Sequence, residues 1–207
     1  KVYEVFPGWK KAVKKVASLD DLKKIRQSLR FENQHFIESD KFCRGNLVFR
    51  AIRNGDLKLM ELFFDTSYDM NSLDVRRGNR NVFMEACSCQ SKMPKCRNTE
   101  MVRLIITASK DQGIDLNMRD PFEQSAFQLA CQSAPLEVPK FLLENYKEFR
   151  IDIMHGDKYG LTAVDHLEWR IDYDKGEEEE EDVKKWEEFK SSLKEEYAKI
   201  ESLEPTA

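Results

Sequence analysis

The sequence "GIDLNMRD", residues 113 to 120, lies between an apolar stretch and an aromatic run that begins at Pro121. Taken alone it is typical of a helix end and a loop, because Gly adopts positive φ and Asn and Asp close local turns with their own side chains. Two other octets share its pattern. In each, position 2 is apolar or aromatic, position 3 is Asp, position 4 is apolar, position 5 is Asn or Met, and position 8 is Asp. They are "SYDMNSLD" (67–74) and "RIDIMHGD" (150–157). The octet is therefore one copy of a periodic unit.

Each octet follows an apolar run with the spacing of one buried helix face. These runs are "LKLMELFF" (57–64), "TEMVRLII" (99–106) and "LEVPKFLL" (136–143). A second pattern, a capping residue followed by apolar residues, lies ahead of each run and suits the start of another helix. Its copies begin at Asn46, Asn81 and Ser125, and a fourth copy, at Thr162, has no octet after it. The sequence therefore predicts an all-α protein built from successive helix pairs.

This layout resembles the ankyrin repeat, a unit of 33 residues with a turn, two helices and the signature T-P-L-H-x-A. The resemblance covers about residues 41–170. Gly160-Leu-Thr162-Ala-Val-Asp is the best match to the start of the unit and Gly113-Ile-Asp-Leu-Asn117 to its end, although no copy keeps the whole tetrapeptide. The resemblance implies an ankyrin-type solenoid of helical pairs with finger turns and capping helices at both ends. The main alternative is another helical-pair solenoid, whose units would lack the D-x-N turn.

The two ends of the chain differ from the repeats, as we expect where a repeat has only one neighbour. We interpret residues 1–40, which include "WKKAVKKVASLDDLKKIRQSL", as N-terminal capping helices or a degenerate repeat. Residues 171–207 are predicted to form an acidic linker, Glu177 to Asp182, and an amphipathic helix whose apolar stripe includes Trp186. This helix either caps the last repeat or binds a partner. The cap is favoured because its aromatic side chains would otherwise be exposed.

Composition excludes several classes of protein. Five cysteines are an odd number and no Asn-x-Ser/Thr sequon occurs, which argues against a disulfide-bonded secreted domain and for an intracellular, cytoplasmic location. No window approaches the roughly 18 consecutive apolar residues of a membrane span. The net charge of −4 argues against general binding of nucleic acid, which needs clustered Lys and Arg.

No motif indicates catalysis, a metal or a cofactor. Cys87, Cys89 and Cys96 offer three thiolates, but zinc sites usually take four ligands. Cys87 and Cys131 directly follow Ala86 and Ala130 at the same place in the repeat, which predicts small buried residues between helices. The sequence shows no nucleophile paired with a base and no Gly-rich phosphate loop, so we expect no enzyme activity.

The resemblance implies a non-catalytic adaptor or scaffold that binds a partner protein with the concave face of the array. The variable positions of fingers and first helices carry over to Arg53, Arg77, Arg80, Phe122, Gln124, Gln132, Lys158, Tyr159, Trp169 and Arg170. Arg and aromatic residues are typical of binding hot spots and predict a partner with an acidic surface and an apolar anchor.

Two alternatives to the adaptor remain open at this point. The first alternative is a permanent structural subunit of a large cytoskeletal or ciliary assembly. The second is a regulatory ankyrin domain of a larger enzyme or channel. The second of these is kept open because the sequence begins at Lys1 rather than Met.

Overall fold

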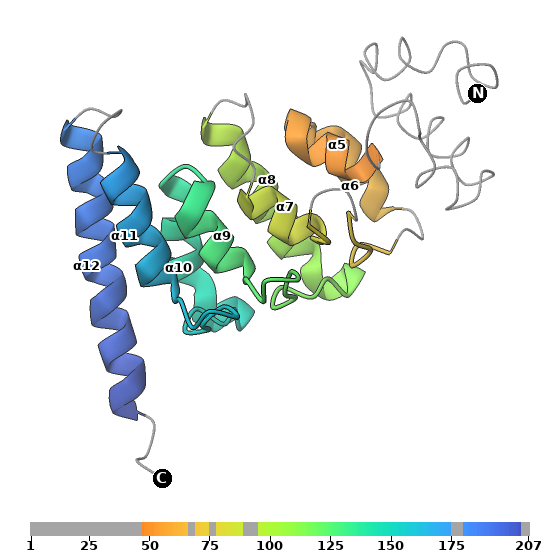
Figure 1. Ribbon diagram of the computed structural model, residues 1–207. Coiled ribbons are helices and arrows are strands. Elements are labelled where there is room, and N and C mark those ends of the chain that lie inside the picture. The colour runs from red at the N-terminus through yellow and green to blue at the C-terminus, as the bar shows by residue number, and fades with distance from the viewer. Residues whose placement is uncertain (1–46, 66–68, 75–77, 89–94, 175–179, 204–207) are drawn as a thin grey trace.

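The computed structural model describes residues 47–65, 69–74, 78–88, 95–174 and 180–203 (Figure 1). Within these ranges every regular element is an α-helix, which confirms the all-α prediction. The predicted N-terminal capping helices, Arg77 and Cys89 lie outside the described residues.

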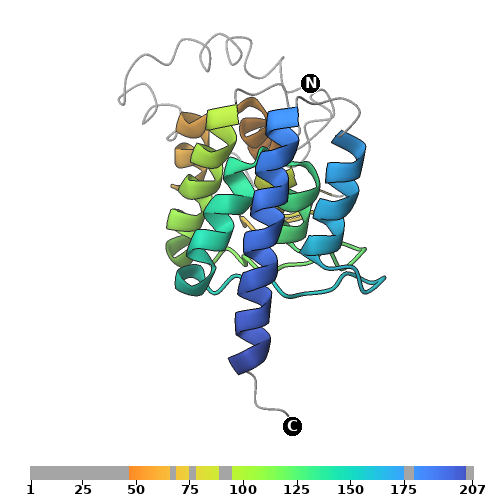
Figure 2. The same cartoon turned by 90° about the vertical axis from the view of Figure 1, so that its left-hand side faces the viewer.

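The described helices form successive pairs, labelled as in Figure 1. They are α5 (Leu47–Asn54) with α6 (Leu57–Phe64), α7 (Val82–Ser88) with α8 (Lys95–Gln112), α9 (Ala126–Ser133) with α10 (Glu137–Phe149), and α11 (Ala163–Asp174) with α12 (Glu180–Leu203). The first helices pack in the order α5, α7, α9, α11, while α6 packs on α8 and α8 on α10. The result is two layers of helices that follow the chain from one end of the molecule to the other (Figures 1 and 2).

Side chains form hydrogen bonds at the start of α7, α9 and α11, whereas the predicted cap Asn46 lies outside the described residues. The Asn81 Oδ1 atom accepts a hydrogen bond from the N–H of Met84, three residues on. Ser125 forms a capping box, in which its hydroxyl accepts from the N–H of Gln128 and the Gln128 side chain accepts from the N–H of Ser125. At the last copy the expected role of Thr162 as acceptor is wrong: its hydroxyl donates, and the Asp165 carboxylate accepts from both the N–H and the hydroxyl of Thr162. These bonds satisfy amide groups that a helix start leaves without partners.

The small residues that follow these caps are buried between neighbouring pairs. Ala86, Cys87, Ala130 and Cys131 are at most 2% exposed, which confirms the packing expected for them. Burial raises the pKa of both thiols far above the ordinary value, so both cysteines stay protonated at neutral pH. These residues therefore act as compact apolar contacts where α7 packs on α9.

Asparagine side chains tie each octet to the next. The amide nitrogen of each Asn donates to the carbonyl of the first residue of the following octet, and its oxygen accepts from the N–H of the third. The distances are 2.7 and 2.8 Å from Asn71 to Gly113 and Asp115, and 2.8 Å for both bonds from Asn117 to Arg150 and Asp152. Met154 occupies the Asn place in the last octet, so this ladder ends there.

The C-terminal helix α12 packs on α11 at the end of the molecule. The apolar stripe of this helix is buried at Trp186, Phe189, Leu193 and Tyr197. The Tyr197 hydroxyl donates to the carbonyl of Ile153 in the last octet. Of the two alternatives left open for this helix, the buried stripe supports the cap.

The predicted acidic linker is partly wrong. Glu180, Glu181 and Asp182 form the first turn of α12, and Glu177–Glu179 lie outside the described residues. Carboxylates are stabilised at a helix N-terminus by the positive end of the helix dipole. The Lys185 ammonium lies 3.3 Å from Glu181 and 2.9 Å from Asp182, which offsets their mutual repulsion.

Candidate functional site

Two finger turns, residues 120–124 and 157–161, share one set of hydrogen bonds. In the first, the Asp120 Oδ1 atom accepts from the N–H of Phe122 at 2.8 Å and of Gln124 at 3.0 Å. In the second, Asp157 Oδ1 accepts from the N–H of Tyr159 at 2.8 Å and of Leu161 at 3.0 Å. Each turn is closed by a further bond from the Asp N–H to the carbonyl of the fifth residue. One buried carboxylate therefore sets the shape of each turn.

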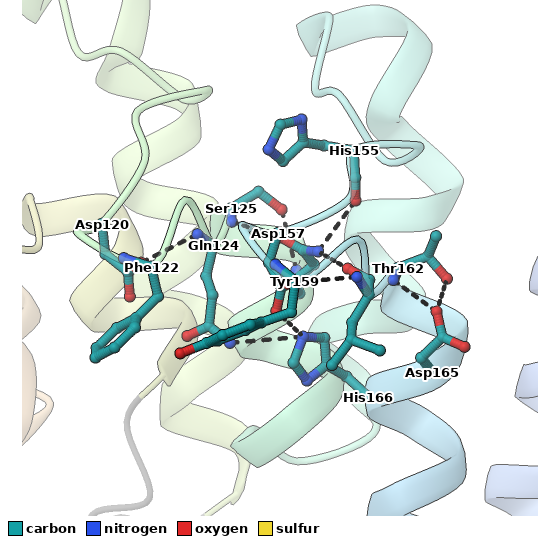
Figure 3. A network of polar contacts seen from close by, with 12 residues as sticks. Asp120, Phe122, Gln124, Ser125, His155, Asp157, Tyr159, Thr162, Asp165 and His166 are labelled. Carbon is teal, nitrogen blue, oxygen red and sulfur yellow. Dashed lines mark hydrogen bonds and ion pairs between the residues drawn. The ribbon is translucent and has the colours of Figure 1, made fainter.

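The two buried carboxylates have different partners. The Asp120 carboxylate lies 3.7 Å from the Arg80 guanidinium. The Asp157 carboxylate lies 3.2 Å from the Nε2 atom of His166, which is itself buried on α11 (Figure 3). Burial by itself would raise the pKa of Asp157, but the N–H groups of its turn and His166 outweigh it and hold the pKa below the usual value.

Each finger turn presents one aromatic ring to solvent. Phe122 is 47% exposed and Tyr159 is 68% exposed. Figure 3 shows both rings on the same side of the turns. Lys158 links the two turns, because its backbone N–H donates to the Phe122 carbonyl at 3.0 Å. Its ammonium lies 4.6 Å from the Phe122 ring centroid and 5.0 Å from that of Tyr159.

Exposed aromatic residues continue along α11. The His166 and Trp169 rings are nearly perpendicular, with ring centroids 5.9 Å apart. Trp169 is 61% exposed, and Tyr173, one helical turn further on, is 70% exposed. Tyr173 was not among the predicted binding residues, although its spacing from Trp169 is a signal in the sequence that places both on one helix face. We call Phe122, Lys158, Tyr159, Trp169 and Tyr173 the aromatic surface.

The predicted arginines occupy different surroundings. Arg53 makes ion pairs with Asp74 at 3.3 Å and with Glu85 at 2.9 Å. Arg170 donates to the carbonyl of Ala134 and lies over the Trp186 ring, 3.9 Å from its centroid. Together with the contact from Arg80 to Asp120, these interactions join one helix pair to the next. The charges of Arg53, Arg80 and Arg170 are therefore engaged in internal contacts.

The two predicted glutamines also differ. Gln124 is half-buried, and its Nε2 atom lies 3.5 Å from the His166 Nε2 atom (Figure 3). Gln132 is exposed on α9, the neighbour of α11. Gln124 thus belongs to the polar network beneath the aromatic surface, whereas Gln132 is open to solvent.

The buried Asp157–His166 pair is a structural support. Both side chains are almost completely shielded from solvent, so neither can touch a solute. His166 follows Asp165 at the start of α11, and its contact with Asp157 joins this helix to the turn that precedes it. The pair therefore positions Tyr159 and Lys158 relative to the aromatic side chains of α11.

Comparison with protein-family models and with curated protein sequences gives no match to this chain. In the part of the chain that the structure describes, no group of three or more His, Cys, Asp or Glu residues is arranged to hold a metal ion. None of the described helices combines the length and the apolar character needed to cross a membrane. The site is therefore interpreted from its own geometry.

Proposed function

We propose that this chain is an intracellular adaptor, a degenerate ankyrin-type repeat array that binds another protein without catalysis. The array is supported by the octets, whose Asn and Asp side chains make the same bonds in successive copies. It is also supported by the helix pairs, whose first helices pack in chain order. Such arrays expose one continuous surface formed by turns and first helices.

The observation that carries the proposal is the exposure of the aromatic surface. Among the described residues, the large hydrophobic side chains that remain exposed are Leu73, Phe122, Tyr159, Trp169, Tyr173 and Leu203. All the aromatic members of this set lie in the fourth repeat or in the finger turn next to it. Exposed Tyr and Trp residues gathered in one region are typical of protein interfaces, where they act as anchors.

The backbone that carries these rings is held in place, which also favours binding. The N–H groups of Phe122 and Tyr159 are held by buried carboxylates, and Trp169 lies on a helix packed against both α9 and α12. A surface that is already ordered loses little conformational entropy when a partner binds. We therefore expect the aromatic side chains to contribute most of the binding free energy.

The first test removes two anchors together, Tyr159→Ser and Trp169→Ser. Proteins retained from a native extract by the wild-type chain but not by the double variant are identified, and the best of them is purified and titrated by calorimetry. We expect the double variant to bind at least 30-fold more weakly, since a hot-spot residue contributes about 2 kcal/mol or more.

A matched control is Leu203→Ser, which removes an exposed apolar side chain at the far end of α12. This control should bind as the wild type does. The proposal fails if no purified partner distinguishes the double variant from the wild type, or if the control loses binding equally.

A further inference from the structure

Lys158 is the cation of the aromatic surface and contacts two of its rings. Its ammonium is positioned by the faces of two rings, Phe122 and Tyr159, rather than by a carboxylate. Ring faces attract ammonium groups because the π-system carries negative charge on its face. Within the described residues Lys158 makes no ion pair, and its side chain is exposed. The ammonium is therefore pre-positioned and open to a ligand.

The other predicted cations that the structure describes are already engaged. Arg53 and Arg80 face buried carboxylates, and Arg170 is bound to a helix carbonyl and a Trp ring. A partner that paired with them would have to break contacts that join the repeats. Lys158 requires no such change, so it is the charge best placed to select a partner.

The acidic residues in the first turn of α12 do not reach this cation. Lys158 lies in the turn that precedes α11, whereas Glu180, Glu181 and Asp182 follow the opposite end of that helix. The twelve residues of α11 separate the two ends by about 18 Å at 1.5 Å per residue. In Figure 1 the start of α12 lies at the edge of the molecule opposite the finger turns. An external carboxylate therefore meets no competitor from this part of the chain.

We propose, building on the proposed function, that the aromatic surface recognises an acidic peptide segment of its partner. An Asp or Glu carboxylate accepts a hydrogen bond from the Lys158 ammonium, and an apolar side chain beside it packs on Phe122 and Tyr159. The apolar side chain of the partner shields the ion pair from water, which strengthens the attraction between the two charges. A basic segment is disfavoured because an ammonium already occupies the place over the rings.

The test is a selection of displayed random 12-residue peptides on the whole chain and on Lys158→Glu. Peptides that bind the wild type should be enriched in Asp or Glu next to Leu, Phe or Trp. They should bind Lys158→Glu at least tenfold more weakly, and Lys158→Gln by a smaller factor. Peptides selected on Lys158→Glu should instead be enriched in Lys and Arg, since the charge that selects them is reversed.

Lys140→Glu is the matched control, because it makes the same change in net charge at an exposed position on the second-layer helix α10. It should select the same peptides as the wild type. Thermal unfolding verifies that each variant is folded.

The outcomes separate this inference from the proposed function. If selected peptides show no excess of acidic residues, or bind Lys158→Glu as tightly as the wild type, the acidic specificity is wrong. The proposed function still stands in that case if the same peptides lose binding to the Tyr159→Ser/Trp169→Ser variant. Both proposals are wrong if the selected peptides bind both variants as tightly as the wild type. They are also wrong if the selection enriches no peptide.

Discussion

The finger turns at Asp120 and Asp157 have the same backbone and different side chains. Both use one buried carboxylate to hold two N–H groups, at distances that agree to within 0.1 Å. Their fourth residues, Glu123 and Gly160, both have positive φ, at 60° and 77°. The difference is that Asp120 faces an arginine and Asp157 a histidine. The turn therefore depends on a carboxylate at its first position and tolerates different partner side chains and different fourth residues.

Loss of the carboxylate leaves Arg80 and His166 in different surroundings. An arginine stays charged at any pH that a protein tolerates, so Arg80 without Asp120 would remain a half-buried, unpaired charge. The His166 Nε2 atom also lies 3.5 Å from the Gln124 Nε2 atom, so His166 keeps a polar neighbour when Asp157 is removed. The same substitution is thus expected to have unequal effects at the two turns.

The largest predicted effect is the loss of the first carboxylate. Asp120→Ala should lower the free energy of unfolding by about 3 kcal/mol, because it breaks a buried ion pair and leaves an arginine without its partner. Asp157→Ala should cost about 2 kcal/mol, through lost hydrogen bonds to the turn. Urea unfolding at pH 7 measures both. Equal losses, or a larger loss at Asp157, would show that the partner of the carboxylate does not distinguish the two turns.

A smaller effect is expected at the fourth residues. Glu123→Gly should stabilise the protein by about 0.5 to 1 kcal/mol, because a left-handed conformation is strained for any residue with a side chain. Gly160→Ala should destabilise it by about 1 kcal/mol. A Cβ atom at Gly160 would meet no other atom within 4 Å, so this loss is conformational and not steric.

Thermal unfolding of the two variants provides the measurement for the fourth residues. The two turns would differ in their backbone requirement if Glu123→Gly lowers the melting temperature or if Gly160→Ala leaves it unchanged.

The smallest predicted effect appears in acid. The pKa of Asp157 is lowered from 3.8 in the folded protein, so its ionised form stabilises the fold above the unfolded value. This contribution is fully present above about pH 3.8 and is lost as the pH falls through the lower, folded pKa. The difference in unfolding free energy between wild type and Asp157→Asn should therefore shrink below pH 3.8. A difference that stays constant down to the acid transition would contradict the lowered pKa.

Much of the helical framework could be predicted because its signals are local. The caps at Asn81, Ser125 and Thr162 bond to residues three positions away, and the octets repeat within a few residues of each helix. Buried small residues follow from the same periodicity. The acidic run was the exception, since Glu180–Asp182 were predicted as a linker and form a helix turn stabilised by Lys185.

The candidate site could be predicted only in part. The exposure of Phe122, Tyr159 and Trp169 fits their places in turns and on first helices, which the repeat pattern assigns. The repeat pattern does not show whether the arginine side chains are paired within the protein or free to bind a partner. Arg53 reaches Glu85 across 32 residues of sequence, and only the packing of α5 on α7 brings them together.

By itself, the sequence determined the helix pairs, their caps and the periodic turns, because each depends on residues within one turn or one helix. Tertiary structure alone decided which charges remain available for a partner. Arg53, Arg80 and Arg170 are engaged by groups on neighbouring repeats, whereas Lys158 rests on two rings and meets no carboxylate among the described residues. Ion pairs between repeats depend on how helices stack, and no local pattern encodes that distance.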